Sequence, residues 1–391
     1  MRRIVSHVVW RWVAVAGATC VVTTLLPLHD AMAVTVRIAP ILTFLVAITV
    51  VAELADRAEV FDLAALEAAR LGGGHRRGLY GLVLALGTLT TAVLGLDTTA
   101  VLVTPVVLSV ARQLRLPTAP FALAAVWLAN TGSLFLPVSN LTNLLAADRL
   151  DLSVIRYASL MWLPALATTL ATAAVLLTTY RRQLRGRYAI PPRRRPRDPV
   201  LFWGATAVSV GVVPAFIVDL PVWAVACAGM VVLAALYAAR RPGTLRLALI
   251  PWRLVVLVWG LFLVVDTLDR FGLRRLLATL AGNGTGALDI ARTVGVTAVL
   301  ANLANNLPAY YAMEAAVGDS APHLLGVLLG ANAGPVVLLW GSLATLLWRD
   351  RCRARGVPIS ARHFTLLGLA GAPLVLAAGL AALLLRLHLA A

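Results

Sequence analysis

Long apolar stretches follow one another along the whole chain, and each is about as long as a membrane-spanning helix. The clearest lie near residues 8–28, 36–54, 120–147, 157–179, 200–218, 222–239, 251–267, 322–347 and 364–388. A helix needs about 20 apolar residues to cross the ~30 Å hydrocarbon core of a bilayer. The runs are continuous rather than alternating, which excludes a membrane β-barrel. The pattern therefore predicts an all-α polytopic membrane protein.

Two further apolar stretches, 78–111 and 290–317, carry polar residues in their middle. Arginines flank the first stretch at both ends, Arg76 before it and Arg112 after it. Because arginines in short loops mark the cytoplasmic side, both ends of this stretch are expected on the same side of the membrane. The pattern predicts a re-entrant hairpin with its tip near Asp97, and the second stretch is its counterpart.

An Arg- and Pro-rich segment, "RRQLRGRYAIPPRRRPRD" (181–198), divides the chain. Its eight Arg make it too polar to insert, and its three Pro disfavour a helix. We interpret it as a cytoplasmic linker between two halves. The predicted organisation is a first repeat (1–180, with hairpin 78–111 and broken span 120–147), the linker (181–199), a linking span (200–218) and a second, inverted repeat (219–391, with hairpin 290–317 and broken span 322–347).

Paired motifs support the repeat. "ANTGSLFLPVSNLTNLL" (129–145) parallels "ANAGPVVLLWGSLATLL" (331–347), and "ELADRAEVFDL" (53–63) parallels "DTLDRFGLRRL" (266–276). Inverted repeats with interrupted helices are typical of secondary transporters, whose sites lie at mid-membrane where the halves meet. Helix breaks persist in lipid only where they line a cavity or are buried in protein.

Composition and charge agree with a membrane protein: 60% of the residues are hydrophobic, 13% are charged, and the mean hydropathy is +0.88. The net charge of +17 is compatible with nucleic-acid binding, but the chain has no Lys and its Arg residues gather in short loops. That distribution follows the positive-inside rule instead. It predicts a multi-pass protein of the cell membrane with a cytoplasmic N-terminus and no nucleic-acid partner. The first apolar stretch could be a cleaved signal peptide that ends near "AMA" (31–33) or a retained first span. Arg11 interrupts the stretch and further spans follow it, and both facts favour a retained span.

The chemistry of the predicted breaks is polar and almost uncharged. The candidate substrate-binding residues are Asp97, Thr98, Thr99, Asn130, Thr131, Ser139, Asn140, Thr142, Asn143, Asn305, Asn306, Asn332, Ser342 and Thr345. The alternative is that they only join helices, through bonds worth ~0.6 kcal/mol each. The three Cys are scattered, so neither a disulfide framework nor a metal site is indicated, and no cofactor is predicted.

Two carboxylates have roles that the residues alone leave open. Asp97 is the one acid at the centre of a polar motif, and a carboxylate inside the membrane must be partnered, hydrated or protonated. It is our candidate for proton coupling, and the alternative, compatible with the first, is an N-cap for a half-helix beginning at Thr98. Glu314 is either a second titrating group or a side chain that snorkels to the mouth of its hairpin.

The motifs resemble a known family. "GLDTTAVLVTPVVLSVARQLRLPTAPFALAAVWLANTGSLFLPVSNLTNLL" (95–145) is similar to the first signature of the arsenite efflux permeases, of the ion transporter superfamily. "NLANNLPAYYAMEA" (302–315), with "LLGANAGPVVLLWGSLATLLW" (328–348), resembles the second. In the related divalent anion/sodium symporters the hairpin tips carry Ser-Asn-Thr, where this chain has residues 97–99 and 305–307.

The resemblance implies a specific transport activity. It implies export of arsenite or antimonite in exchange for protons, with hairpin-bearing domains that move against a scaffold as in an elevator. It also implies a homodimer and, as a partner, a soluble arsenite-stimulated ATPase. Arsenite is mainly a neutral trihydroxide at neutral pH, which suits Asn, Ser and Thr side chains.

Other functions stay open on the same scaffold: a carrier of a carboxylate or other anion, or Na⁺/H⁺ exchange. An intramembrane enzyme or a purely structural bundle is the alternative from a different class. The sequence has no HExxH or GxSxG, and no GxxxxGK[ST] for nucleotide binding. We therefore expect a transporter and not an enzyme.

Overall fold

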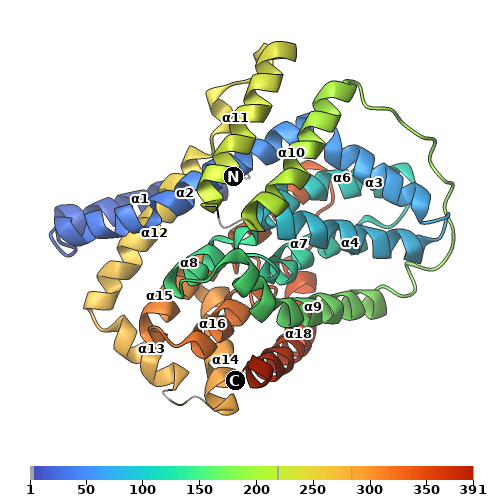
Figure 1. Cartoon of the computed structure of the whole chain (residues 1–391). Helices are drawn as coiled ribbons and strands as arrows, with labels where there is room; N and C mark the ends of the chain where they lie inside the picture. Colours follow the sequence, from blue (N-terminus) through green and yellow to red (C-terminus); the bar gives the residue numbers. More distant parts are fainter. Residues whose placement is uncertain (1–3, 218–219, 283, 285, 391) are drawn as a thin grey trace.

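The computed structural model describes residues 4–217, 220–282, 284 and 286–390, and these are almost entirely helical (Figure 1). Within these ranges the strand-like pairing is limited to one bridge between His75 and Arg187. Seven described helices are long and apolar enough to cross a membrane: α2 (Leu28–Arg57), α4 (Arg76–Leu94), α9 (Val154–Thr179), α10 (Pro199–Ile217), α11 (Val222–Arg240), α14 (Ala287–Ala304) and α18 (Ala361–Ala390). The predicted all-α polytopic class is confirmed.

The long helices of the two halves pack across each other. α1 (Ile4–Val22) lies along α12 (Trp252–Arg270), and α11 lies along α2 (Figure 1). Glycines allow the first pair to approach closely: a Cβ on Gly260 would lie 2.9 Å from the carbonyl oxygen of Val13. Small residues at a contact let membrane helices pack backbone to backbone. Each half thus supplies one helix that packs on the other half.

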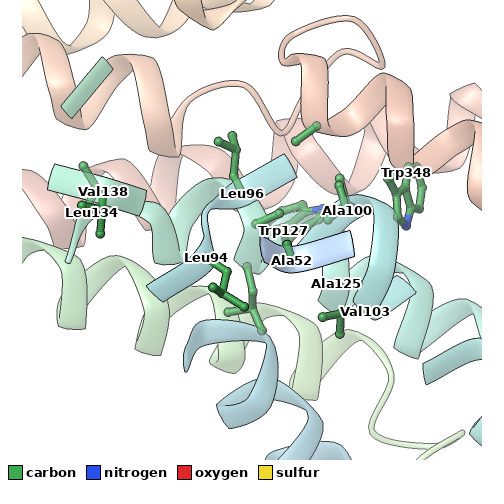
Figure 2. Close-up of a cluster of buried hydrophobic side chains, with 14 of the residues drawn as sticks. Ala52, Leu94, Leu96, Ala100, Val103, Ala125, Trp127, Leu134, Val138 and Trp348 are labelled. Carbon is green, nitrogen blue, oxygen red and sulfur yellow. The ribbon is translucent and has the colours of Figure 1, made fainter. Parts of the chain in front are cut away.

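The first hairpin turns at Gly95. α4 ends at Leu94, Gly95 takes φ +89° and ψ 164°, and the chain resumes as α5 (Leu96–Thr98). This backbone conformation is essentially restricted to glycine. A π-helical turn (Thr99–Val103) and α6 (Thr104–Gln113) follow. Figure 2 shows apolar side chains around this break, with Leu94 and Leu96 on its two sides.

The second hairpin turns in the same way at Asn305. Its φ of 87° and ψ of 150° nearly repeat those of Gly95, between α14 and α15 (Asn306–Val317). Short amphipathic helices precede both hairpins: α3 (Val60–Leu71) packs on α4 and α6, and α13 (Leu273–Ala281) packs on α14 and α15. The two halves therefore repeat the same succession of elements.

Two spans are broken in their middle. The first runs from α7 (Thr118–Thr131) through two 3₁₀ turns to α8 (Leu141–Arg149), and the second from α16 (Ala321–Ala333) to α17 (Leu343–Ala354). α15 packs on α8, while α5 and the π-helical turn pack on α17. Each hairpin thus contacts the other half at its broken span, and α9 and α18 lie side by side beside them (Figure 1).

The Arg-rich segment is held against the rest of the protein. It runs as an extended strap from α9 past α3 to α10 (Figure 1). The Tyr188 amide donates to the Gly74 carbonyl at 2.8 Å, and the Arg194 guanidinium donates to Glu59 Oε1 at 2.6 Å. The Arg197 amide donates to the second oxygen of Glu59 at 2.8 Å. One carboxylate therefore binds the strap at two points.

Candidate functional site

Asn332 of the second half is the centre of a buried hydrogen-bond cluster with the first half. Its Oδ1 accepts from Asn140 Nδ2 at 2.7 Å and from Thr142 Oγ1 at 2.9 Å. Its Nδ2 donates to Asn143 Oδ1 at 2.6 Å. All four residues are buried. The cluster joins α16 to the start of α8 at the two helix breaks.

A second contact joins the halves, and here the asparagine belongs to the first half and its partner to the second. Asn130 Nδ2 of α7 donates to Thr345 Oγ1 at 3.4 Å and to the Val126 carbonyl at 2.9 Å. Thr345 also bonds to Ser342, whose hydroxyl caps α17. In the paired motifs Asn130 corresponds to Asn332, and Thr345 to Asn143. The two contacts are therefore counterparts under the repeat.

These seven residues are hereafter the bridging set: Asn130, Asn140, Thr142, Asn143, Asn332, Ser342 and Thr345. None of their side chains is charged, and each amide or hydroxyl can both donate and accept. Both spans break beside these residues, and helix ends carry partial charges of roughly half a unit. The arrangement suits a small solute with several hydroxyl groups.

Two asparagines also form hydrogen bonds with backbone groups at the breaks. Asn143 Nδ2 donates to the Ser133 and Leu136 carbonyls, at 2.6 and 3.0 Å. In the second half Asn302 does the same: Nδ2 donates to the Gly334 carbonyl at 2.8 Å, and Oδ1 accepts from the Leu338 amide at 3.0 Å. Sequence reasoning did not select Asn302, although it lies in the same Asn-rich stretch as Asn305.

Asp97 lies in the middle of α5, two residues beyond the turn at Gly95. α5 begins at Leu96 and has no side-chain cap, so the alternative of Asp97 as an N-cap is wrong. The carboxylate atom Oδ1 is buried and has no hydrogen-bond partner among the described residues. Asp97 is thus a half-buried residue with one buried carboxylate oxygen that lacks a partner among the described residues, at the hairpin end that packs on α17.

The hairpin-tip residues bond within their own half. Thr98 Oγ1 donates to the Leu94 carbonyl at 2.7 Å, and Thr99 shares a 2.8 Å bond with Thr91. Asn305 Nδ2 donates to the Trp340 carbonyl at 3.0 Å. These contacts fix the turns rather than bridge the halves.

Three more candidates lie outside the bridging set. Ser139 donates to the Ala92 carbonyl at 2.9 Å, which ties the first broken span to α4. Thr131 faces α9, where it accepts from Thr172 at 3.1 Å. Asn306 is buried at the first residue of α15. The structure therefore brings half of the predicted residues into two groups of contacts between the halves, whereas the others bond within their own half or have no side-chain hydrogen bond to the other half among the described residues.

Comparisons with known proteins agree with this architecture. The model of the CitMHS family, described as a citrate transporter, matches residues 4–345. The "Arsenical pump membrane protein" of Yersinia enterocolitica is 31% identical over 367 residues, which cover 88% of this chain and 85% of the relative. The protein of the same name from Escherichia coli strain K12 is 31% identical over 368 residues, with the same coverage.

A solved structure matches the fold. The crystal structure of the YdaH transporter of Alcanivorax borkumensis, described as having an unusual topology, aligns with a TM-score of 0.59. The alignment covers 92% of this chain and 89% of that one, at 14% sequence identity. Together with the relatives above, this places the chain among multi-pass membrane transporters. The chain belongs to the CitMHS family and to the family of the arsenical pump membrane proteins.

Proposed function

We propose that this protein exports arsenite or antimonite from the cell in exchange for protons. The observation that carries the proposal is the uncharged bridging set between the two broken spans. A neutral trihydroxide offers three donors and several acceptors, which amides and hydroxyls can match without an ionic partner. The name of the relatives, Arsenical pump membrane protein, supports the same solute.

In the proposed mechanism the bridging bonds exchange for bonds to the solute. Asn332, for example, bonds here to three side chains of the other half, and these same groups become available when the halves separate slightly. Replacing one hydrogen bond by another of similar strength changes the free energy little. The hairpins and broken spans are the part we propose to move, against a scaffold that includes α1, α2, α11 and α12.

Asp97 is the proposed proton-coupling group. Its unpartnered buried oxygen favours protonation, because an ionised carboxylate without partners is costly inside the membrane. One charge that crosses 100 mV releases ~2.3 kcal/mol. At roughly 150 mV, one proton per neutral solute sustains about a 300-fold gradient, since ~1.4 kcal/mol corresponds to a factor of ten.

The test is arsenite efflux from cells without an exporter of their own, together with uptake into inverted membrane vesicles under an imposed pH gradient. We expect the protein to confer arsenite resistance and ΔpH-driven uptake. Asp97→Asn should keep arsenite exchange but lose ΔpH-driven accumulation, whereas Asp148→Asn, on an exposed site of α8, should pump normally. Undiminished accumulation by Asp97→Asn removes Asp97 from this role.

A carboxylate carrier is the second candidate, because the family model is described as a citrate transporter. Helix N-termini can bind carboxylates without a basic side chain. The bridging set nevertheless contains no Arg or His, which favours a neutral solute. Citrate, succinate and Na⁺ gradients in the same vesicles separate the candidates, and uptake of citrate without uptake of arsenite contradicts the proposal.

The proposal also includes the cellular setting. We place the protein in the cell membrane with a cytoplasmic N-terminus, as a homodimer, with a soluble arsenite-stimulated ATPase as a partner. Chemical cross-linking in membranes tests the dimer. Co-purification with such an ATPase, and ATP-dependent efflux after collapse of the proton gradient, test the partner.

A further inference from the structure

A partly buried ion pair links the second hairpin to a spanning helix of the first half. Arg37 Nη2 of α2 donates to both carboxylate oxygens of Glu314 on α15, at 2.9 Å each. Tyr310 donates to the same carboxylate at 3.3 Å, and the Arg37 guanidinium lies 5.7 Å from the Tyr311 ring centre. The Glu314 side chain is only 3% exposed, so it does not snorkel.

The pair borders a small cavity of charged side chains. The cavity has a volume of about 150 Å³ and reaches Glu314 from between α2, α8, α12 and α13. Besides the pair itself, the charged groups that line the cavity are Arg149 on α8, Asp266 and Asp269 on α12, and Arg274 on α13. Arg149 is paired with Asp319 at 2.7 Å. Of the described residues of α14 and α16, the other helices packed on α15, none lines it.

The pair connects the second hairpin to a long helix of the first half, so movement of the hairpin would affect it. α15 begins at the turn of Asn305 and packs on α8, the helix that carries Asn143 of the bridging set. α2 is a 30-residue helix that packs on α11 and α12. Any shift of the hairpin relative to α2 must stretch or break the Arg37–Glu314 contact. A charged Glu314 left without Arg37 in this place is strongly disfavoured.

We propose that Glu314 is a proton-accepting switch residue, distinct from the coupling group Asp97, which holds α15 to α2 when ionised and releases it when protonated. The proton comes from water in the cavity and binds one Glu314 oxygen. The two bonds from Arg37 weaken, and the guanidinium keeps its charge and faces the carboxylates of α12. When α15 returns, the proton leaves to the cavity and the pair reforms. The inference rests on the proposed proton exchange but has a readout that needs no substrate.

The test measures the distance between spin labels on Val36→Cys, an exposed residue of α2, and Val317→Cys, at the end of α15, with Cys20, Cys227 and Cys352 replaced. The protein is studied in lipid nanodiscs at roughly pH 8 and roughly pH 5, on either side of the range in which buried carboxyls titrate. We expect one short distance at high pH and a second, longer population at low pH. Glu314→Gln should show both populations at both pH values.

Controls separate this inference from the proposed function. Glu53→Gln removes a carboxylate whose partner, Arg57, lies on the same helix, and should respond to pH like the parent. The inference is overturned if the label-to-label distance in the parent does not change with pH, or if it still changes with pH in Glu314→Gln. If Glu314→Gln does not fold, Arg37→Gln must lose the pH response instead. Absence of arsenite transport in the parent would contradict the proposed function alone.

Discussion

At the scale of single residues, the bridging set makes an asymmetric prediction. Asn332→Ala removes three buried hydrogen bonds. It leaves Asn140 Nδ2 without a partner, at about 1–3 kcal/mol, and leaves Thr142 and Asn143 with only their mutual 3.4 Å bond at these atoms. Asn130→Ala removes one bond of 3.4 Å to the other half, so its cost should be smaller. We expect the melting temperature in detergent to fall more for Asn332→Ala than for Asn130→Ala.

The control for this comparison is Thr178→Ala, which removes only two exposed bonds to its own helix. It should melt like the parent. A double-mutant cycle of Asn332→Ala with Asn143→Ala should give a coupling energy above the error of the measurement, because these side chains bond directly at 2.6 Å. Independent, additive effects would mean that the contact does not stabilise the folded protein.

Asn305 combines a side chain with a backbone conformation that suits glycine. Asn305→Gly and Asn305→Ala both lose the bond to the Trp340 carbonyl, but only alanine keeps the strain of φ 87°. The strain costs about 1–3 kcal/mol at such a position. We therefore expect the alanine variant to melt clearly below the glycine variant, and equal melting temperatures would contradict a strained turn.

At the scale of elements, the first hairpin depends on Gly95 for the same reason. A Cβ there would lie 3.4 Å from the Ser139 carbonyl oxygen, an ordinary contact, so the cost of Gly95→Ala comes from the backbone alone. We expect a loss of about 1–3 kcal/mol, and a smaller loss for Gly95→Asn, because asparagine holds this conformation at Asn305. Thermal unfolding of the purified variants measures both.

The matched control is Gly81→Ala, in the same helix α4. A Cβ on Gly81 meets nothing within 4 Å, and alanine is the better helix former by roughly 1 kcal/mol. This variant should be as stable as the parent or more stable. If Gly81→Ala were as damaging as Gly95→Ala, the effect would not come from the turn.

How far the sequence predicts these elements depends on the physics involved. Lipid demands long apolar helices and tolerates breaks only beside polar groups, so the spans and the regions of Asp97 and Asn305 could be found from pattern alone. The turn at Gly95 and the π-helical turn after it could not, because both follow from local packing. The sequence also does not predict which asparagines bond to the backbone and which bond to the other half. Asn302 and Asn332 differ in this respect because different groups lie opposite them in the fold.

At the scale of the whole molecule, contacts between the halves are the least predictable from sequence. Arg37 and Glu314 lie 277 residues apart, and only Glu314 falls within one of the paired signatures. Arg37 alone reads as an isolated charge in an apolar span. Only the inverted packing of α15 against the first half explains why both charges are present. The paired motifs indicate that Asn130 and Asn332 occupy equivalent positions. The fold is needed to predict which side chains they contact.

The strap between the halves provides a test of the orientation of the whole molecule. Its arginines are trypsin sites, and Glu59, which is only 9% exposed, holds it through Arg194 and the Arg197 amide. Glu59→Gln removes the charge that strengthens both bonds, so the strap should detach more often. We expect trypsin to cut this variant several times faster than the parent, because cleavage follows the population of the open form.

The expected cleavage is confined to one face of the membrane, since the positive-inside rule puts the arginines in the cytoplasm. Inverted vesicles should be cut between the halves, and intact spheroplasts should be protected. Glu53→Gln, which loses a pair with Arg57 on the same helix α2, is the control and should be cut at the parental rate. Cleavage in spheroplasts would show that every helix has the opposite orientation to the one predicted. Equal cleavage rates for Glu59→Gln and the parent would show that Glu59 does not hold the strap, and would say nothing about the orientation. The two results are independent, because the first depends on the side that the protease reaches and the second on how firmly the strap is bound.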